Sequence, residues 1–282
     1  MMLHRLASSR RLASTLAGGF GHTISEITAR PGFFSLTLSR PEVHNAIDDE
    51  MIHALSATLD QLHAHDGLRG VFLRGEGKSF CAGGDLGWMR RAADLTTEEN
   101  EKDALALSRM LQKLATLPCA TVALVHGNAF GGGVGMISAC DIAVGVQGAK
   151  FSLSEAKLGL IPATISPFVV ARIGPNNARR FFLTAERFDA AKATQIGLLH
   201  EVCDDAAALE GWAEHFATEI TACAPSAVVA GKELITAVEY RERDDELLME
   251  TARRLSAQRD SDEGREGIGA FLNKRKPTWA AA

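Results

Sequence analysis

Short runs of apolar residues alternate along this chain with longer segments in which apolar residues recur every three or four positions. The runs predict buried strands, and a further strand precedes the turn signal Pro31-Gly32. The predicted strands cover residues 23–28, 33–38, 71–73, 121–125, 142–146 and 151–153. Continuous apolar runs of this length are typical of strands covered on both faces.

Two segments have the helical period. Asp48 is a candidate N-cap for a helix whose apolar face comprises Met51, Ile52, Leu55, Leu59 and Leu62. The segment 98–117 predicts a second helix that ends before Pro118. Its inward face is expected to comprise Leu105, Leu107, Met110, Leu111 and Leu114.

From Ser166 onward the strand signals vanish and helical patterns dominate. Strands separated by helices predict an α/β fold rather than a β-sandwich. We expect one domain over residues 23–282, with a core at 23–200 and a helical region at 201–282. That region is expected to cover the core or to form an oligomer contact.

Composition narrows the class of protein. Of 282 residues, 46% are apolar and 23% charged, as in ordinary globular proteins. No apolar run is long enough for a membrane helix, and the net charge of −5 argues against binding to nucleic acid or anionic lipid. The five cysteines are odd in number and include no CxxC pair, which favours buried thiols over disulfides or zinc.

Residues 1–22 differ from the rest of the chain. They contain Arg5, Arg10 and Arg11, four serines and threonines, and no acidic residue. This composition is typical of a mitochondrial transit peptide and predicts location in the mitochondrial matrix. The alternative is a disordered arm on a cytoplasmic protein.

Two glycine-rich segments are the candidates for chemistry. Residues 79–86 follow one predicted strand, and residues 127–133 follow another and open a helix. Small residues let the backbone approach a ligand closely, and a helix N-terminus presents free N–H groups. Two such loops facing each other would form an oxyanion hole. Neither segment has the glycine spacing of a P-loop or of a dinucleotide-binding motif, and no G-x-S-x-G or HExxH motif occurs.

These segments resemble the enoyl-CoA hydratase/isomerase (crotonase) superfamily. The resemblance rests on Phe80-Cys81-Ala82-Gly83-Gly84-Asp85-Leu86, on Gly131-Gly132-Gly133, and on Ser154-Glu155 with the following segment to Pro162. Arg40-Pro41-Glu42-Val43-His44-Asn45-Ala46 is similar to the family's first ligand-lining segment. The resemblance covers about residue 24 to the C-terminus and implies a crotonase spiral of ββα units with a C-terminal helical region.

Within the family, Asp85–Met89 and the segments 160–167 and 181–188 resemble a particular branch. Its members hydrate 3-methylglutaconyl-CoA in leucine degradation or the related isoprenoid glutaconyl-CoA. The resemblance implies that the backbone N–H groups of Ala82 and Gly132 hold the thioester oxygen. It also implies that Glu155 exchanges a proton at the α-carbon. Burial beside an acyl chain is expected to raise the pKa of Glu155.

The chain departs from the two-glutamate hydratases at Gly135, where they carry a second glutamate. This leaves open an enoyl-CoA delta-isomerase that uses Glu155 as a single proton shuttle. Since the glutaconyl branch also lacks the second acid, hydration is favoured. We expect the distal carboxylate of a glutaconyl substrate to contact the water instead, held by Arg90 or Arg91. A catalytically silent scaffold is disfavoured by the retained Glu155.

The substrate implied by the resemblance is a coenzyme A thioester, without a metal or redox cofactor. His44 and Lys78 are expected to lie near its phosphates or adenine, and Phe271 and Lys274 to be contributed by an adjacent subunit. The family implies a homotrimer or a dimer of trimers. The remaining expected substrate-binding residues are Ala46, Phe80, Gly83, Gly84, Asp85, Leu86, Gly131 and Pro162.

Overall fold

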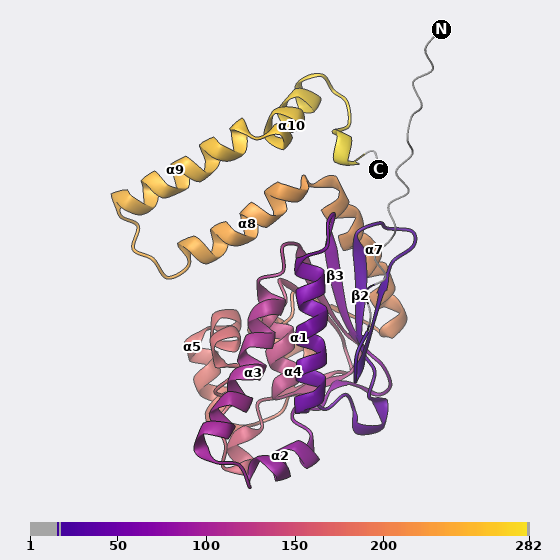
Figure 1. Ribbon diagram of the computed structural model, residues 1–282, viewed down its shortest axis with the longest axis vertical. Coiled ribbons are helices and arrows are strands. Elements are labelled where there is room, and N and C mark those ends of the chain that lie inside the picture. Colours follow the sequence, from indigo (N-terminus) through magenta and orange to yellow (C-terminus); the bar gives the residue numbers. More distant parts are fainter. Residues whose placement is uncertain (1–15, 17, 281–282) are drawn as a thin grey trace.

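The computed structural model describes residue 16 and residues 18–280 (Figure 1). Most of the predicted transit peptide, residues 1–15 and 17, therefore lies outside the described residues. The last part of that segment belongs to the fold, because His22 opens the first strand and is buried.

Two sheets form the centre of the molecule. The larger has six strands in the order β1-β2-β3-β5-β7-β10, parallel except for the β1–β2 hairpin. Its strands are β1 (His22–Glu26), β2 (Phe33–Leu38), β3 (Gly70–Gly75), β5 (Ala120–Val125), β7 (Ile142–Val146) and β10 (Glu201–Cys203). The crossover connections contain the helices, as parallel strands require.

The smaller sheet has four strands in the order β4-β6-β8-β9, and only the β8–β9 pair is antiparallel. They are β4 (Ser79–Cys81), β6 (Asn128–Phe130), β8 (Lys150–Ser152) and β9 (Phe188–Asp189). Three of them alternate with strands of the larger sheet along the chain. Each ββα repeat therefore passes from the large sheet to the small sheet before it enters a helix.

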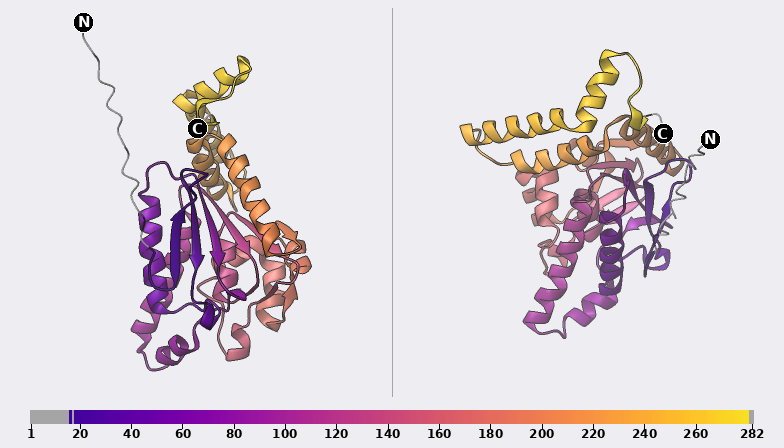
Figure 2. Two further views of the ribbon diagram at one scale, coloured as in Figure 1. Left: turned by 90° about the vertical axis from the view of Figure 1, so that its right-hand side faces the viewer. Right: turned by 45° about the horizontal axis from the view of Figure 1, so that its top comes forward.

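Helices cover the large sheet on two sides (Figures 1 and 2). Helices α1, α3, α4 and α5 contact one another in that order, whereas α7 contacts β3, β5, β7 and β10. Their bounds are α1 (Asp49–His63), α3 (Thr97–Ala115), α4 (Gly132–Ala139), α5 (Ser166–Thr184) and α7 (Ala206–Ala222). The shorter helices are α2 (Leu86–Ala92), α6 (Ala190–Gln195) and the 3₁₀ turns η1 (Pro41–Val43), η2 (Glu155–Leu158) and η3 (Thr278–Ala280).

The two long predicted helices form, each with a polar cap. The Asp48 carboxylate accepts from the backbone N–H of Met51, which confirms the expected N-cap of α1. Helix α3 begins with a capping box between Thr96 and Glu99. Leu107, Met110, Leu111 and Leu114 face inward as predicted. Leu105 is 42% exposed, so its expected burial is wrong.

The expectation that strands end at Ser166 is wrong, because β9 and β10 both follow it. They contain two and three residues, too few to give an alternating pattern. Strands β4 and β6 have three residues each, so the sequence pattern does not separate them from the glycine-rich segments 79–86 and 127–133. The thiols are also less uniformly buried than predicted: Cys81, Cys119 and Cys140 are buried, Cys203 is partly exposed and Cys223 is exposed.

Helices α8 (Pro225–Val238), α9 (Asp245–Asp260) and α10 (Asp262–Leu272) form an arm that projects from the sheets (Figures 1 and 2). One anchor is Lys232 on α8, which lies 2.8 Å from the Asp141 carboxylate and donates to the Cys119 carbonyl oxygen. Asp141 in turn accepts from the backbone N–H and the hydroxyl of Thr121. The arm is thus fixed at the amino ends of β5 and β7.

Candidate active site

Both glycine-rich loops and Glu155 meet at one point. A Cβ atom added to Gly131 would lie 3.0 Å from Glu155 Oε1 and 3.8 Å from the Cα of Gly83. A Cβ atom added to Gly83 would lie 3.1 Å from the Phe130 carbonyl oxygen. The carboxylate and the two loops, from three separate parts of the chain, are therefore in van der Waals reach, and the glycines make this approach sterically allowed.

The first loop turns at Gly83, whose φ of 95° lies in the region that favours glycine. Before the turn, the N–H of Ala82 donates to the His44 carbonyl oxygen at 3.0 Å. This bond occupies the donor that was expected to hold a thioester oxygen. The prediction for Ala82 is therefore corrected: in this structure its N–H faces the His44 segment and not the meeting point.

Gly84 lies after the turn and forms an isolated parallel bridge with Ile47. The two hydrogen bonds of this bridge, each 2.8 Å, use Gly83 O and Asp85 N. In a parallel pair, the residue between two such groups directs its own N–H to the opposite edge. That edge is where β4 pairs with β6 and where Gly131 follows. The N–H of Gly84 thus faces the second loop.

The second loop is held open by Gly131, whose N–H donates to the Ser152 carbonyl oxygen at 2.9 Å. Its φ of 47° turns the chain into α4, of which Gly132 is the first residue. Within residues 16 and 18–280, no hydrogen bond uses the N–H of Gly84 or Gly132. Two free backbone donors, one of them at a helix N-terminus, therefore face the space beside Glu155.

Glu155 is the first residue of η2, directly after the small sheet. Its Oε2 atom is buried and has no hydrogen-bond partner among the described residues. Burial raises the pKa of this carboxyl group, because the charged form loses solvation and a hydrogen bond from its own backbone N–H offsets only part of that loss. A half-buried carboxyl group with one buried oxygen that lacks a partner, beside free amide donors, is suited to move protons rather than to stabilise the fold.

Position 135 is closed by packing. A Cβ atom on Gly135 would lie 2.8 Å from the Cβ of Ile165 and even closer to its Cγ2. Ile165 is 2% exposed and is the N-cap residue of α5. The side chain of Ile165 therefore fills the space into which a second glutamate would extend. The departure from the two-glutamate pattern therefore involves two positions, Gly135 and Ile165, and only Gly135 is recognisable from the sequence.

The remaining predicted substrate-binding residues on the first segments and at residue 162 differ in their access to solvent. The His44 Nδ1 atom is 3.2 Å from the hydroxyl of Ser79, and Leu86 is 76% exposed at the start of α2. The Asp85 carboxylate caps α2 by accepting from the N–H groups of Gly87 and Trp88. Ala46 and Pro162 are buried, and Lys78 is exposed.

Two groups of predicted contacts are not assembled at the centre. Phe80 is fully buried in the hydrophobic core, so its ring is not available to a ligand. Phe271 is 83% exposed on α10, within the arm that projects from the sheets (Figure 1). Lys274 follows it and is also exposed.

The two arginines expected to hold a distal carboxylate differ. Arg91 lies 2.5 Å from the Asp49 carboxylate and is thus already paired. Arg90 is exposed and makes no ion pair with a described residue. Trp88 and Met89 face the donor loop, since a Cβ atom on Gly84 would lie 3.6 and 3.7 Å from them. Of the pair, only Arg91 is held by an ion pair within the described residues.

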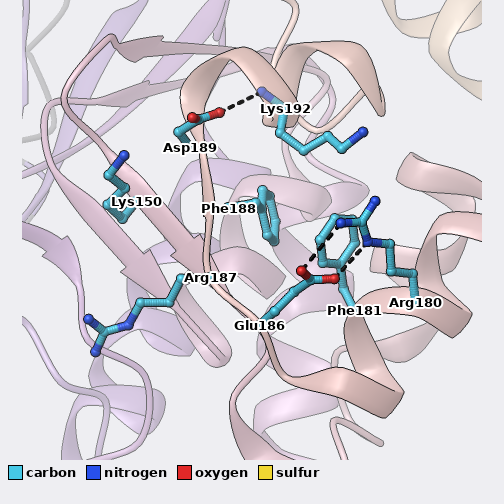
Figure 3. A pocket seen from close by; sticks show the side chains of 8 residues that line it. All are labelled: Lys150, Arg180, Phe181, Glu186, Arg187, Phe188, Asp189 and Lys192. Carbon is cyan, nitrogen blue, oxygen red and sulfur yellow. Dashed lines mark hydrogen bonds and ion pairs between the residues drawn. The ribbon is translucent and has the colours of Figure 1, made fainter.

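A cavity of about 440 Å³ lies between β8, β9, α5 and α6 (Figure 3). Its lining includes Phe181 and Phe188, and Arg180 pairs there with Glu186 at 2.6 Å. It contains none of the predicted site residues. In the part of the chain that the structure describes, no cluster of three or more His, Cys, Asp or Glu side chains could hold a metal ion. No described helix is long and apolar enough to span a membrane.

A family model, solved structures and curated relatives all place this chain among enoyl-CoA hydratases and isomerases. The family model described as "Enoyl-CoA hydratase/isomerase" matches residues 28–282. An enoyl-CoA hydratase structure from Shewanella pealeana superposes with a TM-score of 0.88 at 38% identity, over 92% of this chain and 96% of that one.

Curated relatives include both hydratases and isomerases. Enoyl-CoA hydratase AKT6-1 from Alternaria alternata is 33% identical over 273 residues, which is 95% of this chain and 88% of the relative. The 1,2-epoxyphenylacetyl-CoA isomerase of Escherichia coli is 33% identical over 256 residues, 88% of this chain and 95% of the relative. The two sheets, the projecting helices and these matches identify the crotonase fold, and the chain belongs to the enoyl-CoA hydratase/isomerase family of enzymes.

Proposed function

We propose that this protein hydrates the α,β double bond of an enoyl-CoA thioester. The observation that carries the proposal is the unpaired, buried Glu155 Oε2 beside the free N–H groups of Gly84 and Gly132. Gly84 replaces Ala82 as the first oxyanion donor. Removing one such donor typically costs ~10²–10³ in rate.

The proposed reaction begins with Glu155 in its carboxylate form. Glu155 takes a proton from water while the water oxygen bonds to the β-carbon. The electrons of the double bond move to the thioester carbonyl, and the two N–H groups stabilise the resulting enolate. Glu155 then returns the proton to the α-carbon, which restores the carbonyl. The raised pKa of Glu155 makes its carboxylate a stronger base for the first transfer.

We propose 3-methylglutaconyl-CoA in leucine degradation, or a related isoprenoid glutaconyl-CoA, as the substrate. The resemblance of segments 85–89, 160–167 and 181–188 supports this choice. The closed position 135 supports it as well, because a one-acid hydratase needs another group to orient water, and the substrate carboxylate supplies one. Arg90 is the proposed partner of that carboxylate.

A delta-isomerase is the second candidate, and one specific observation favours it. With Ile165 packed on Gly135, position 135 offers no second carboxylate, and Glu155 is the carboxylate that lies against the second loop. A single carboxylate is sufficient to move a proton from one carbon to another without water. Relatives of both kinds occur in the family.

Mass spectrometry separates the two candidates. The protein is incubated with 3-methylglutaconyl-CoA, its isoprenoid homologue and crotonyl-CoA, and with a 3-enoyl-CoA for the isomerase reaction. Hydration adds the mass of water, whereas isomerisation leaves the mass unchanged and moves the double bond. Turnover of the 3-enoyl thioester without any hydration would overturn the proposed reaction.

We further propose a homotrimer or a dimer of trimers that requires no metal or redox cofactor. The arm exposes large apolar side chains, including Ile235, Leu255, Ile268 and Phe271, as expected of a surface that covers another subunit. In this assembly Phe271 and Lys274 contact coenzyme A bound to a neighbour. The mitochondrial matrix is the proposed location, on the composition of residues 1–22.

A further inference from the structure

We propose that Arg40 is a positioning residue, which sets the directions of both oxyanion donors without contacting the substrate. The inference rests on the proposed function, because it concerns the same two N–H groups. Arg40 lies between the strand β2 and the loop that carries His44, outside both glycine-rich segments.

The Arg40 guanidinium joins the loop before α1 to the loop before α2. Its NH1 atom donates to the Ala46 carbonyl oxygen at 2.7 Å and lies 2.9 Å from the Asp48 carboxylate. Its NH2 atom lies 3.4 Å from the Asp85 carboxylate. These three partners flank Ile47 and Gly84, so a single side chain fixes the segments on both sides of the bridge.

The cluster of Arg40, Asp48 and Asp85 is largely buried, so its charges depend on one another. The side chains of Arg40, Asp48 and Asp85 are 13%, 11% and 17% exposed, and the guanidinium lies 5.1 Å from the ring centre of Phe20. Loss of the cation would leave two largely buried carboxylates near each other without a counter-charge. Each carboxylate also caps a helix, so the N-termini of α1 and α2 depend on the same group.

Arg40 influences the N–H groups of Gly84 and Gly132 through Ile47. The bridge between Ile47 and Gly84 sets where the N–H of Gly84 points. The Cδ1 atom of Ile47 lies 2.9 Å from the place that a Cβ atom on Gly132 would take. Ile47 therefore spaces Gly84 from Gly132. Its backbone neighbours on either side, Ala46 and Asp48, are the ones that Arg40 holds.

The backbone of the same loop is fixed independently, which keeps the Arg40 side chain separable from folding. The Asn45 side chain donates to the carbonyl oxygens of Glu76 and Ser79 at 2.9 Å each, and its Oδ1 accepts from the backbone N–H of Arg40. None of these bonds involves the guanidinium, so all of their donors and acceptors remain in Arg40→Met. We expect Arg40→Met to fold and to lose the alignment of the donors.

The experiment compares Arg40→Met with Arg180→Met. Arg180 is a matched control, because it also pairs with a carboxylate, that of Glu186, and lies 5.3 Å from the ring centre of Phe181. The first readout is the infrared carbonyl stretch of bound [1-¹³C]butyryl-CoA, which cannot be hydrated. Hydrogen bonds from both donors shift this stretch to lower frequency, and a purely structural residue would not affect the shift.

In the unaltered protein and in Arg180→Met we expect the full shift. In Arg40→Met we expect loss of most of the shift, a decrease of about 10²-fold in kcat, and a Kd for coenzyme A within about twofold. An unchanged carbonyl shift in Arg40→Met would overturn the inference. No shift in the unaltered protein would contradict the proposed function itself.

Asp85→Asn is a second variant in case Arg40→Met does not fold. It keeps the Asp48 partner of Arg40 and an Oδ1 acceptor for the cap of α2, and it removes the negative charge that links Arg40 to the loop of Gly84. We expect a partial loss of the carbonyl shift. A full shift in folded Asp85→Asn would count against the link between Arg40 and Gly84.

Discussion

The centre of the site and the C-terminal arm are built in opposite ways. At the centre, Gly84, Gly132 and Glu155 lie on short segments that are anchored to the two sheets by backbone hydrogen bonds. The arm of α8–α10 exposes much of its apolar surface, and ion pairs such as Lys232–Asp141 connect it to the core. The difference indicates that one chain supplies the geometry of the reaction, whereas the exposed apolar surface of the arm is the part that the proposed assembly would cover.

The largest effect is expected at Glu155. Glu155→Gln keeps the shape of the side chain and removes proton transfer, so kcat is expected to fall by ~10³ or more. Steady-state kinetics measures the fall, and the Kd for coenzyme A checks that binding is retained. Substantial turnover by this variant would show that another group moves the proton.

The same substitution is expected to stabilise the fold. Burial raises the pKa of Glu155 in the folded state above its unfolded value of 4.5, so the folded state loses stability as pH rises from that value through the folded pKa. Gln carries no charge and avoids this loss. We expect Tm of Glu155→Gln to exceed that of the unaltered protein at pH 8 and to match it below pH 4. A difference that does not depend on pH would contradict a buried carboxylate.

A smaller effect is expected at the second loop. Gly131→Ala places a methyl group 3.0 Å from Glu155 Oε1 at a φ of 47°, so it moves both the carboxylate and the backbone. We expect kcat to fall by ~10². The matched control is Gly84→Ala, whose methyl group meets Trp88 and Met89 at ordinary distances. Its kcat is expected to stay within about threefold, and equal losses in both variants would mean that the loops act only through packing.

Because Ile165 packs on position 135, a larger residue there is expected to destabilise the fold. Gly135→Glu is expected to lower the free energy of unfolding by ~1–3 kcal/mol, because Ile165 occupies the space that the new side chain needs. Urea denaturation measures this loss. The double variant Gly135→Glu with Ile165→Gly is expected to recover part of it. A single variant as stable as the unaltered protein would show that the segment around Ile165 moves easily.

The smallest effects are expected in the arm. Phe271→Ala and Lys274→Ala should raise KM by about three- to tenfold and leave kcat within about twofold, because neither residue lies beside Glu155. Sedimentation in parallel establishes the oligomeric state. A decrease in kcat at constant KM would place these residues closer to the reaction than the arm allows.

Much of the fold could be predicted from periodicity, because the long helices and the buried strands have clear patterns. Strands β9 and β10 could not, since two or three residues leave no period to detect, and their pairing depends on strands far away in the sequence. The exposure of Leu105 shows the same limit for a helix, because the width of the buried face is set by the neighbouring helices.

At the site, the sequence was sufficient to predict that Glu155 and Gly132 lie beside the first glycine-rich loop. It was not sufficient to choose between Ala82 and Gly84 as the donor. The choice depends on the turn at Gly83, after which the N–H of Gly84 faces away from the His44–Asp48 segment. Nor could the pattern reveal that Ile165 fills the space beside position 135, because thirty residues separate Gly135 from Ile165 and the two meet only in the folded chain.

The packing of Ile165 on Gly135 has a consequence for how such enzymes change their chemistry. A new acid at 135 is penalised while the isoleucine remains, and a smaller residue at 165 leaves a hole while the glycine remains. Whichever position is replaced first, the single variant is expected to be less stable than the unaltered protein. Libraries that aim to convert this enzyme to two-acid catalysis should therefore randomise both codons at once, and lineages that differ at one of these positions should differ at the other.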